Sequence, residues 1–234
     1  RDDVESRGLG DVYKRQEQEM ALISRIVRKH DLALIADEVY REFVYDGEYK
    51  SFGTMPELAE HLIMIDSVSK RYSACGARIG CVMTKNKELS AQLLKCCQAR
   101  LSVSQLDQAG ATGLYTTPAS YWEEVRNEYT RRRDTLKEAL SAMPGVISSE
   151  PKGAFYVMVK LPVDNIEKFA QWLLTDFAID NETVMITPGN GFYVSSPDRG
   201  RDECRIAYVL NCEDLKKAMH ILAEGLKQYP GRTL

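Results

Sequence analysis

The chain has 234 residues, of which 44% are hydrophobic and 28% charged, a composition typical of a soluble globular protein with one large domain or two modest ones. Its formal net charge of −3 favours neither a nucleic acid nor a membrane surface as a partner. No apolar run approaches the roughly 20 residues that span a bilayer, and the charged N-terminus lacks the apolar core of a secretory signal.

The first sixteen residues share no pattern with the rest of the chain. They are dense in charge, and residues 10–16 resemble a run attached to unrelated truncated reading frames in assembled sequence data. We therefore expect residues 1–16 to be a foreign or disordered leader, with a native mobile arm as the alternative. The fold prediction begins at Glu17.

The first half of the chain alternates helical and strand patterns. Apolar residues at helical spacing predict an amphipathic helix from Glu17 to about His30. Continuous apolar runs at 32–36, 62–65 and 79–83 predict strands, and we expect the first to be a parallel strand buried on both faces. Alternating helices and strands indicate an α/β sheet.

The predicted elements after residue 83 fall into two groups, one before Gly145 and one after it. Before it, helical spacing continues, and Pro118 is well placed to open a long helix because a proline is favourable in a first turn. After it, strands and helices predict a second, smaller α+β domain. The predicted helices are 87–100, 104–114, 118–140, 166–177 and 213–229, and the predicted strands are 155–159, 184–187 and 205–209.

The cysteines and histidines do not predict a metal site. The six cysteines contain no Cys-x-x-Cys pair, and the three histidines are scattered, so the spacing argues against zinc. We expect the cysteines to be reduced thiols in a cytoplasmic protein, most of them small core residues.

The run from Asp66 to Gly80 carries the strongest chemical signal. It places Lys70 at the end of an apolar strand, with the hydroxyls of Ser67 and Ser69 before it and Arg78 further on. A lysine amine forms a Schiff base with an aldehyde, and hydroxyls with a guanidinium bind a phosphate. The run therefore predicts covalent binding of a phosphorylated aldehyde.

A second run, Asp37-Glu38-Val39-Tyr40, supplies a carboxylate and a phenol at the end of another apolar strand. Open α/β sheets bind ligands at the carboxyl ends of their strands, so both runs are expected at one edge of the sheet. Asp-Glu-x-Tyr is a weak motif by itself. It gains weight here because it stands on the strand before the lysine strand.

Together the two runs resemble the cofactor site of the class I/II aminotransferases, the fold-type-I enzymes that use pyridoxal 5'-phosphate. The resemblance is of the aspartate/aromatic aminotransferase kind and covers nearly everything from Glu17 onward. It implies that Lys70 is the catalytic Schiff-base lysine. The other implied roles are Ser67, Ser69 and Arg78 on the cofactor phosphate, Asp37 on the pyridine nitrogen, Tyr40 on the ring oxygen and Arg205 on the substrate α-carboxylate.

The resemblance also implies an architecture. Residues 17–117 would form part of a large cofactor-binding domain with a mostly parallel sheet, and residues 118–234 an interdomain helix and a small C-terminal domain. A complete family member carries a long segment ahead of Glu17, including a ring stacked on the cofactor and an Asn-Pro turn, and no Asn-Pro dipeptide occurs here. We therefore expect an N-terminally truncated chain that is a poor catalyst alone.

The implied function is transfer of an amino group between an L-amino acid and a 2-oxo acid through the Lys70 Schiff base. The family also implies a homodimer for the intact protein, and neither a nucleic acid nor a membrane is expected as a partner. Two alternatives remain open at this point: a carbon–sulfur lyase of the same fold, and a non-enzymatic regulator domain of aminotransferase type.

Overall fold

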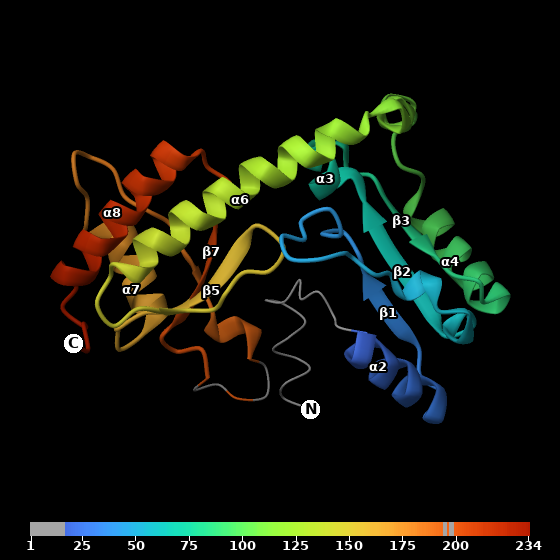
Figure 1. Cartoon of the computed structure of the whole chain (residues 1–234), viewed down its shortest axis with the longest axis horizontal. Coiled ribbons are helices and arrows are strands. Elements are labelled where there is room, and N and C mark those ends of the chain that lie inside the picture. Colours follow the sequence, from blue (N-terminus) through green and yellow to red (C-terminus); the bar gives the residue numbers. More distant parts are fainter. Residues whose placement is uncertain (1–16, 194–195, 197–198) are drawn as a thin grey trace. The chain divides into compact units, whose positions relative to one another are not determined.

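The computed structural model describes residues 17–193, 196 and 199–234, so the leader expected over residues 1–16 lies outside the described part of the chain. The described residues form two compact units, 17–123 and 124–234. The chain passes from the first to the second inside helix α6 (Ala119–Ser141) (Figure 1). The domain boundary expected at residue 117 lies just ahead of this helix and remains a prediction.

The first unit combines a three-stranded sheet with helices. Strand β1 runs parallel to β2, with Leu34 opposite Leu62, whereas β3 runs antiparallel to β2, with Gly80 opposite Ser67. The carboxyl ends of β1 and β2 therefore lie at one edge, where β3 begins. The elements are α2 (Glu17–Lys29), β1 (Leu34–Asp37), β2 (Leu62–Ser67), α3 (Val68–Arg71), β3 (Gly80–Met83), α4 (Lys87–Arg100) and α5 (Gln105–Thr112).

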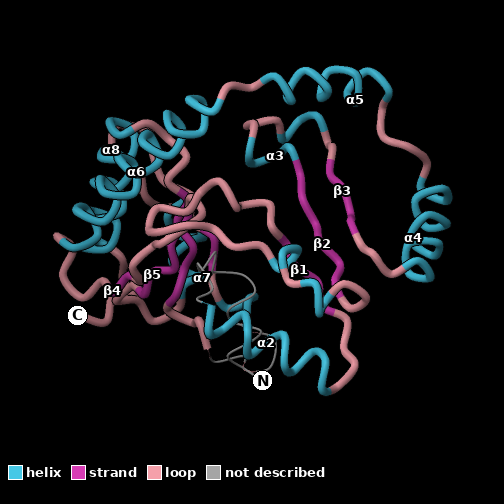
Figure 2. The backbone as a smooth tube through the Cα atoms, turned by 45° about the vertical axis from the view of Figure 1, so that its right-hand side comes forward, coloured by secondary structure: helices cyan, strands magenta, loops and turns pink. Residues whose placement is uncertain are grey.

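One face of this sheet carries the core of the first unit. The apolar stripe of α2, with Met20 and Val27, packs with Ala36 and Leu62 of the sheet and with Leu58. Side chains alternate along a strand, so the residues between these core positions point to the opposite face. Helix α4 lies alongside β3 in both views (Figure 1 and Figure 2).

The opposite face is partly exposed, which corrects one expectation. The strand registers place Ile35, Ile63, Ile65 and Val82 on this face. Ile35 is 63% exposed and Val82 49% exposed. The prediction that the first strand is buried on both faces is therefore wrong for the described chain, because α2 packs against one face only.

The second unit is an antiparallel sheet with helices packed on it. The strand order is β4-β5-β7-β6, and β5 pairs with β7 along its whole length. The strand expected at 184–187 is shorter and shifted along the chain. Strand β6 consists of Thr187 and Pro188, so only Thr187 of the expected residues pairs with β7. The remaining elements are β4 (Ile147–Ser148), β5 (Tyr156–Lys160), α7 (Ile166–Thr175), β6 (Thr187–Pro188), β7 (Glu203–Ala207) and α8 (Cys212–Gln228).

The core of the second unit is fully buried. Phe169, Leu173, Tyr208 and Leu222 are each 0% exposed. Helix α8 approaches α7 closely at Gly225, where an added Cβ would lie 2.9 Å from the Leu173 Cδ2. A larger residue at this position would therefore force neighbouring side chains of a closely packed core to shift. No helix in the described ranges is both long and apolar enough to cross a membrane.

Candidate active site

Two of the predicted residues follow β1. Asp37 ends the strand, is exposed, and accepts a hydrogen bond of 3.2 Å at its Oδ1 from the Val39 N–H. Tyr40 lies in the turn that follows, where its half-buried ring meets the buried Phe43 edge-on at a centroid distance of 6.2 Å. The Asp37 Cα pairs with that of Ile65, so Asp37 lies opposite the carboxyl-terminal half of β2, the strand that leads into α3 and Lys70.

The two predicted hydroxyls form a pair at the start of α3. Ser67 has an extended backbone and caps the helix, because its Oγ accepts the Ser69 N–H at 3.0 Å. The two Oγ atoms lie 2.8 Å apart, and the Ser67 Oγ lies 2.9 Å from the carbonyl oxygen of Ile79. These contacts join the turn that carries Lys70 to the residue just ahead of β3.

Arg78 holds an unusual backbone conformation. Its φ of 53° and ψ of 38° are left-handed, a region that favours glycine and costs a larger residue roughly 1–3 kcal/mol. The exposed guanidinium donates from its Nη1 to the Cys75 carbonyl at 3.0 Å. Strained positions of this kind cluster at functional sites, where the surrounding structure enforces them.

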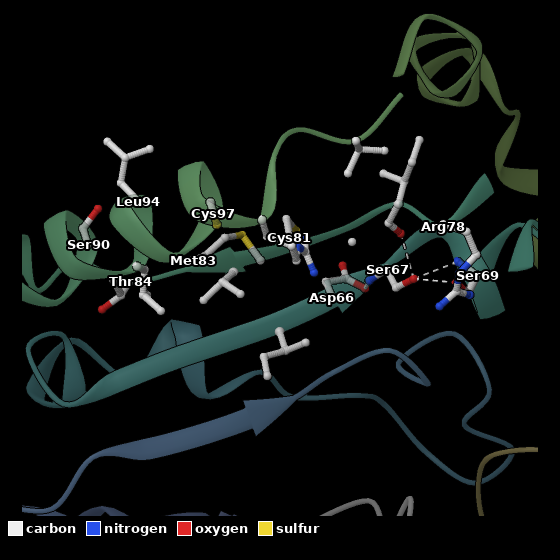
Figure 3. Close-up of a pocket in the computed structure, with 17 residues that line it drawn as sticks. Asp66, Ser67, Ser69, Arg78, Cys81, Met83, Thr84, Ser90, Leu94 and Cys97 are labelled. Atoms are coloured by element: carbon white, nitrogen blue, oxygen red, sulfur yellow. Dashed lines mark hydrogen bonds between the residues drawn. The ribbon is translucent and has the colours of Figure 1, made fainter. Parts of the chain in front are cut away.

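These residues share a pocket of about 720 Å³ (Figure 3). Ser67, Ser69 and Arg78 lie together at one end of it, and the pocket continues past Cys81 between β3 and α4. Hydroxyls beside a guanidinium are a donor set suited to a phosphate. Residues that line the pocket at its other end include Met83, Thr84, Ser90 and Leu94.

The pocket does not gather every predicted site residue. Lys70 is half-buried in α3, directly after Ser69, but it is not among the residues that line the pocket. Asp37 and Tyr40 also lie outside it. The structure thus brings the three predicted phosphate ligands together, and the roles of all these residues remain predictions.

A cluster of four charged residues at the same edge was missed by the sequence analysis. Asp66 is 7% exposed, and its Oδ2 lies 2.6 Å from the Arg71 Nη2 and 3.3 Å from the Arg41 Nη1. Glu42 completes the cluster, with its Oε1 at 3.6 Å from the Nε atoms of both arginines. The sequence places these residues beside the two motifs, but it does not reveal which charges pair across the strands.

The seventh predicted residue, Arg205, belongs to the second unit. It lies in the middle of β7, and its guanidinium carbon is 5.3 Å from the ring centroid of Tyr156 and 5.5 Å from that of Phe192. Both distances suit a cation–π contact, which restricts the side chain to one region. The aromatic contacts could not be read from the sequence, since Tyr156 and Phe192 are distant from Arg205 along the chain.

Most of the cysteines do not lie in the core, so the expectation that they are mainly small core residues is wrong. All six cysteines are free, and Cys75, Cys81, Cys96 and Cys97 are exposed. Partial burial raises the pKa of the Cys81 thiol, and the nearby Asp66 carboxylate adds to this, so the thiol stays protonated at neutral pH. No three histidine, cysteine or acidic side chains among the described residues are grouped as metal ligands.

Comparisons with known proteins point to one family. The sequence model for aminotransferase class I and II matches residues 9–222. The chain is 30% identical over 203 residues to an arginine–pyruvate transaminase of Pseudomonas aeruginosa, which covers 86% of this chain and 49% of that protein. It is 26% identical over 222 residues to an aspartate aminotransferase of Bacillus subtilis, with coverages of 91% and 54%.

A solved structure agrees with the sequence relatives. The aromatic aminotransferase of Pyrococcus horikoshii superposes with a TM-score of 0.78 at 26% identity, over 91% of this chain and 56% of that one. The chain thus spans about half the length of the curated relatives it matches.

Proposed function

This chain belongs to the class I and II aminotransferases and has their fold-type-I architecture, and from that premise we propose that it uses pyridoxal 5'-phosphate to move an amino group between an L-amino acid and a 2-oxo acid. The observation that carries the proposal is the shared pocket wall formed by Ser67, Ser69 and Arg78 beside the Lys70 turn. This donor set fits the phosphate of the cofactor.

The three proposed phosphate ligands would contact the phosphate in different ways. The Arg78 guanidinium offers a planar pair of donors that matches two phosphate oxygens. The Ser69 hydroxyl is held 2.8 Å from the Ser67 Oγ, which also faces the Ile79 carbonyl at 2.9 Å. Because a hydroxyl has a single proton, Ser67 donates to one acceptor at a time, so donation to the phosphate would replace its contact with the Ile79 carbonyl or the Ser69 Oγ.

When bound, pyridoxal phosphate supplies an electron sink that stabilises a carbanion at the substrate Cα. The exposed Asp37 carboxylate would keep a proton on the pyridine nitrogen, and the Tyr40 phenol would donate to the ring oxygen. Lys70 would bond the cofactor aldehyde and later carry the proton that leaves the Cα. Arg205 would hold the substrate α-carboxylate and so fix the direction of the bond that breaks.

We also propose a cellular compartment and an oligomeric state for the whole protein. The six free thiols support a reducing, cytoplasmic compartment, because structural disulfides are typical of oxidising ones. The intact protein is proposed to be a homodimer, with amino acids and 2-oxo acids as its substrates. The bare apolar face around Ile35 and Val82 is consistent with further protein packing against the first unit.

Covalent trapping tests the proposal. The full chain is incubated with pyridoxal phosphate, reduced with borohydride and mapped by mass spectrometry, and a pyridoxyl group on Lys70 is the expected result. Lys70→Arg keeps the charge but removes the reactive amine, and Lys87→Arg at the start of α4 is the matched control. Absence of an adduct, or adducts spread evenly over surface lysines, would contradict the proposal.

A second assay separates the amino transfer from a lyase reaction. A lyase releases pyruvate and ammonia from a suitable amino acid without an acceptor, whereas an aminotransferase requires a 2-oxo acid. Any turnover by the chain is therefore measured with and without the acceptor. Product formation that is independent of the acceptor would favour the lyase reading.

A further inference from the structure

We propose that Asp66 is a positioning residue whose carboxylate ties together the two strand-end segments that carry Lys70 and Tyr40. The proposal rests on the proposed function, because it assigns the consequence of this tie to the reactivity of Lys70. Asp66 links the two segments through Arg41 at 3.3 Å, and Glu42 makes a second, longer link to Arg71 at 3.6 Å.

The first step is the closed turn around Lys70. The Asp66 Oδ1 accepts the Ser67 N–H at 2.8 Å, and its Oδ2 accepts from the Arg71 Nη2 at 2.6 Å. One carboxylate thus holds the residue at the start of the turn and the residue directly after Lys70. The side chains of Asp66 and Arg71 are only 10% and 14% exposed, so this charge-assisted pair is shielded from water.

The second step links this turn to the segment that follows β1. The Arg41 Nη1 lies 3.3 Å from the same Oδ2 of Asp66, and Arg41 directly follows Tyr40 in the chain. The Arg41 side chain is 30% exposed, so this contact is weaker than the one to Arg71. The Asp66 carboxylate therefore adds a side-chain link between the Tyr40 segment and the Lys70 turn, beside the backbone hydrogen bond of 2.9 Å from the Glu38 N–H to the Ile65 carbonyl.

The third step is the charge balance of the cluster. Two guanidinium groups face two carboxylates, and Glu42 contacts both arginines at 3.6 Å. Glu42 lies in the segment that follows β1, so its contact with Arg71 is a second link to the Lys70 turn. At 3.6 Å this contact is longer than those that Asp66 makes to Arg71 and Arg41. Loss of the Asp66 charge leaves two arginines facing one acid, so both strand-end segments should loosen together.

Three single substitutions, at Asp66, Arg71 and Arg41, should each change hydrogen–deuterium exchange of the full chain in different segments. Asp66→Asn should speed exchange in residues 38–44 and 66–73 together, by about tenfold, as expected for one lost charge-assisted hydrogen bond. Arg71→Gln should speed exchange mainly in 66–73, and Arg41→Gln mainly in 38–44. Glu128→Gln, which breaks an ion pair with Arg132 at 2.8 Å in α6, is the control and should leave both segments unchanged.

Several outcomes would overturn the proposal. Asp66→Asn could change only one segment or neither, or it could speed exchange equally over the whole chain. If Asp66→Asn does not fold, as judged by circular dichroism, the two arginine variants decide. Equal loosening of both segments by each of them would contradict the linking role of Asp66.

Borohydride trapping tests whether the link made by Asp66 affects the reactivity of Lys70. In Asp66→Asn the share of pyridoxyl found on Lys70 should fall about tenfold relative to other lysines, in proportion to the loosened turn. Unchanged trapping alongside faster exchange would overturn the positioning role. If the unmodified chain gives no Lys70 adduct, the proposed function fails, while the exchange pattern still decides whether Asp66 joins the two segments.

Discussion

The phenol hydroxyl of Tyr208 donates a hydrogen bond of 3.0 Å to the backbone carbonyl of Ala154 inside the second unit. Tyr208 is 0% exposed and Ala154 is 1% exposed. Ala154 has a φ of 57°, a left-handed conformation that is unfavourable for alanine. The buried tyrosine thus anchors a strained residue just ahead of β5, and β5 is the strand that pairs with β7, which carries Arg205.

Tyr208→Phe tests this anchor. The substitution keeps the ring and removes only the hydroxyl, so the free energy of unfolding should fall by about 1 kcal/mol, the typical contribution of one hydrogen bond. Urea unfolding followed by circular dichroism measures the loss. Tyr115→Phe, at a position that is 91% exposed, should leave the stability unchanged. Equal stabilities of all three proteins would show that the hydroxyl contributes nothing.

We expect the folded chain to lose stability at alkaline pH because of the buried Cys204 thiol. Burial, and then the neighbouring Glu203 carboxylate, raises the pKa of this thiol from 9.0 to about 12. The unfolded thiol ionises at the lower pKa while the folded one stays protonated. This contribution to stability is therefore complete below about pH 9 and is lost as the pH rises towards about 12.

The measurement compares the unmodified chain with Cys204→Ala in urea at about pH 8 and about pH 10.5. The unmodified chain should lose more stability between the two pH values than the variant does. Other groups titrate in the same range, but they do so in both proteins and cancel in the comparison. Identical pH dependence in the two proteins would rule out a buried, protonated Cys204.

Arg78→Lys tests the phosphate assignment. Lysine keeps the charge but cannot offer two parallel donors, so Lys70 labelling by pyridoxal phosphate should fall about tenfold, while labelling by pyridoxal, which has no phosphate, should change little. Arg100→Lys, which alters another arginine that lines the same pocket, is the control. An equal effect on both aldehydes would mean that Arg78 supports the fold of the turn and does not bind the phosphate.

Leu101 is a site where glycine should stabilise the chain. It follows α4 with a φ of 71° and a ψ of 167°, which is a region open almost only to glycine, and its side chain is 77% exposed. Leu101→Gly should therefore raise the free energy of unfolding by about 1 kcal/mol. Leu106→Gly, at an 86% exposed position inside α5, should lower it by a similar amount. Destabilisation by both substitutions would contradict the strain at Leu101.

Sequence reasoning worked where a local signal defined the element. The helix at 87–100 is confirmed to the residue, because Asn86 caps it by accepting the Leu89 N–H at 2.9 Å. The strand expected at 184–187 depended on its partner, and of its four residues only Thr187 pairs with β7. Burial of the first strand on both faces depended on what packs against the sheet, which the composition of the strand does not specify.

The same distinction applies to the site. Ser67, Ser69 and Arg78 stand close together in the sequence, and a short turn suffices to bring them to one pocket wall. The pairing of Asp66 with Arg41 joins different segments, and charge pairs of this kind leave no periodic signal in a single sequence. The tight turn that places Arg78 in a left-handed conformation is equally invisible there, because arginine gives no hint of it.

The bare side of the first sheet has a thermodynamic consequence. Ile35 and Val82 expose apolar surface to water, and β1 and β3 are the outer strands of the described sheet. Contact between two such sides releases that water, a gain that is entropic near room temperature. Self-association of this chain should therefore strengthen on moderate warming and with sulfate, and reverse on cooling.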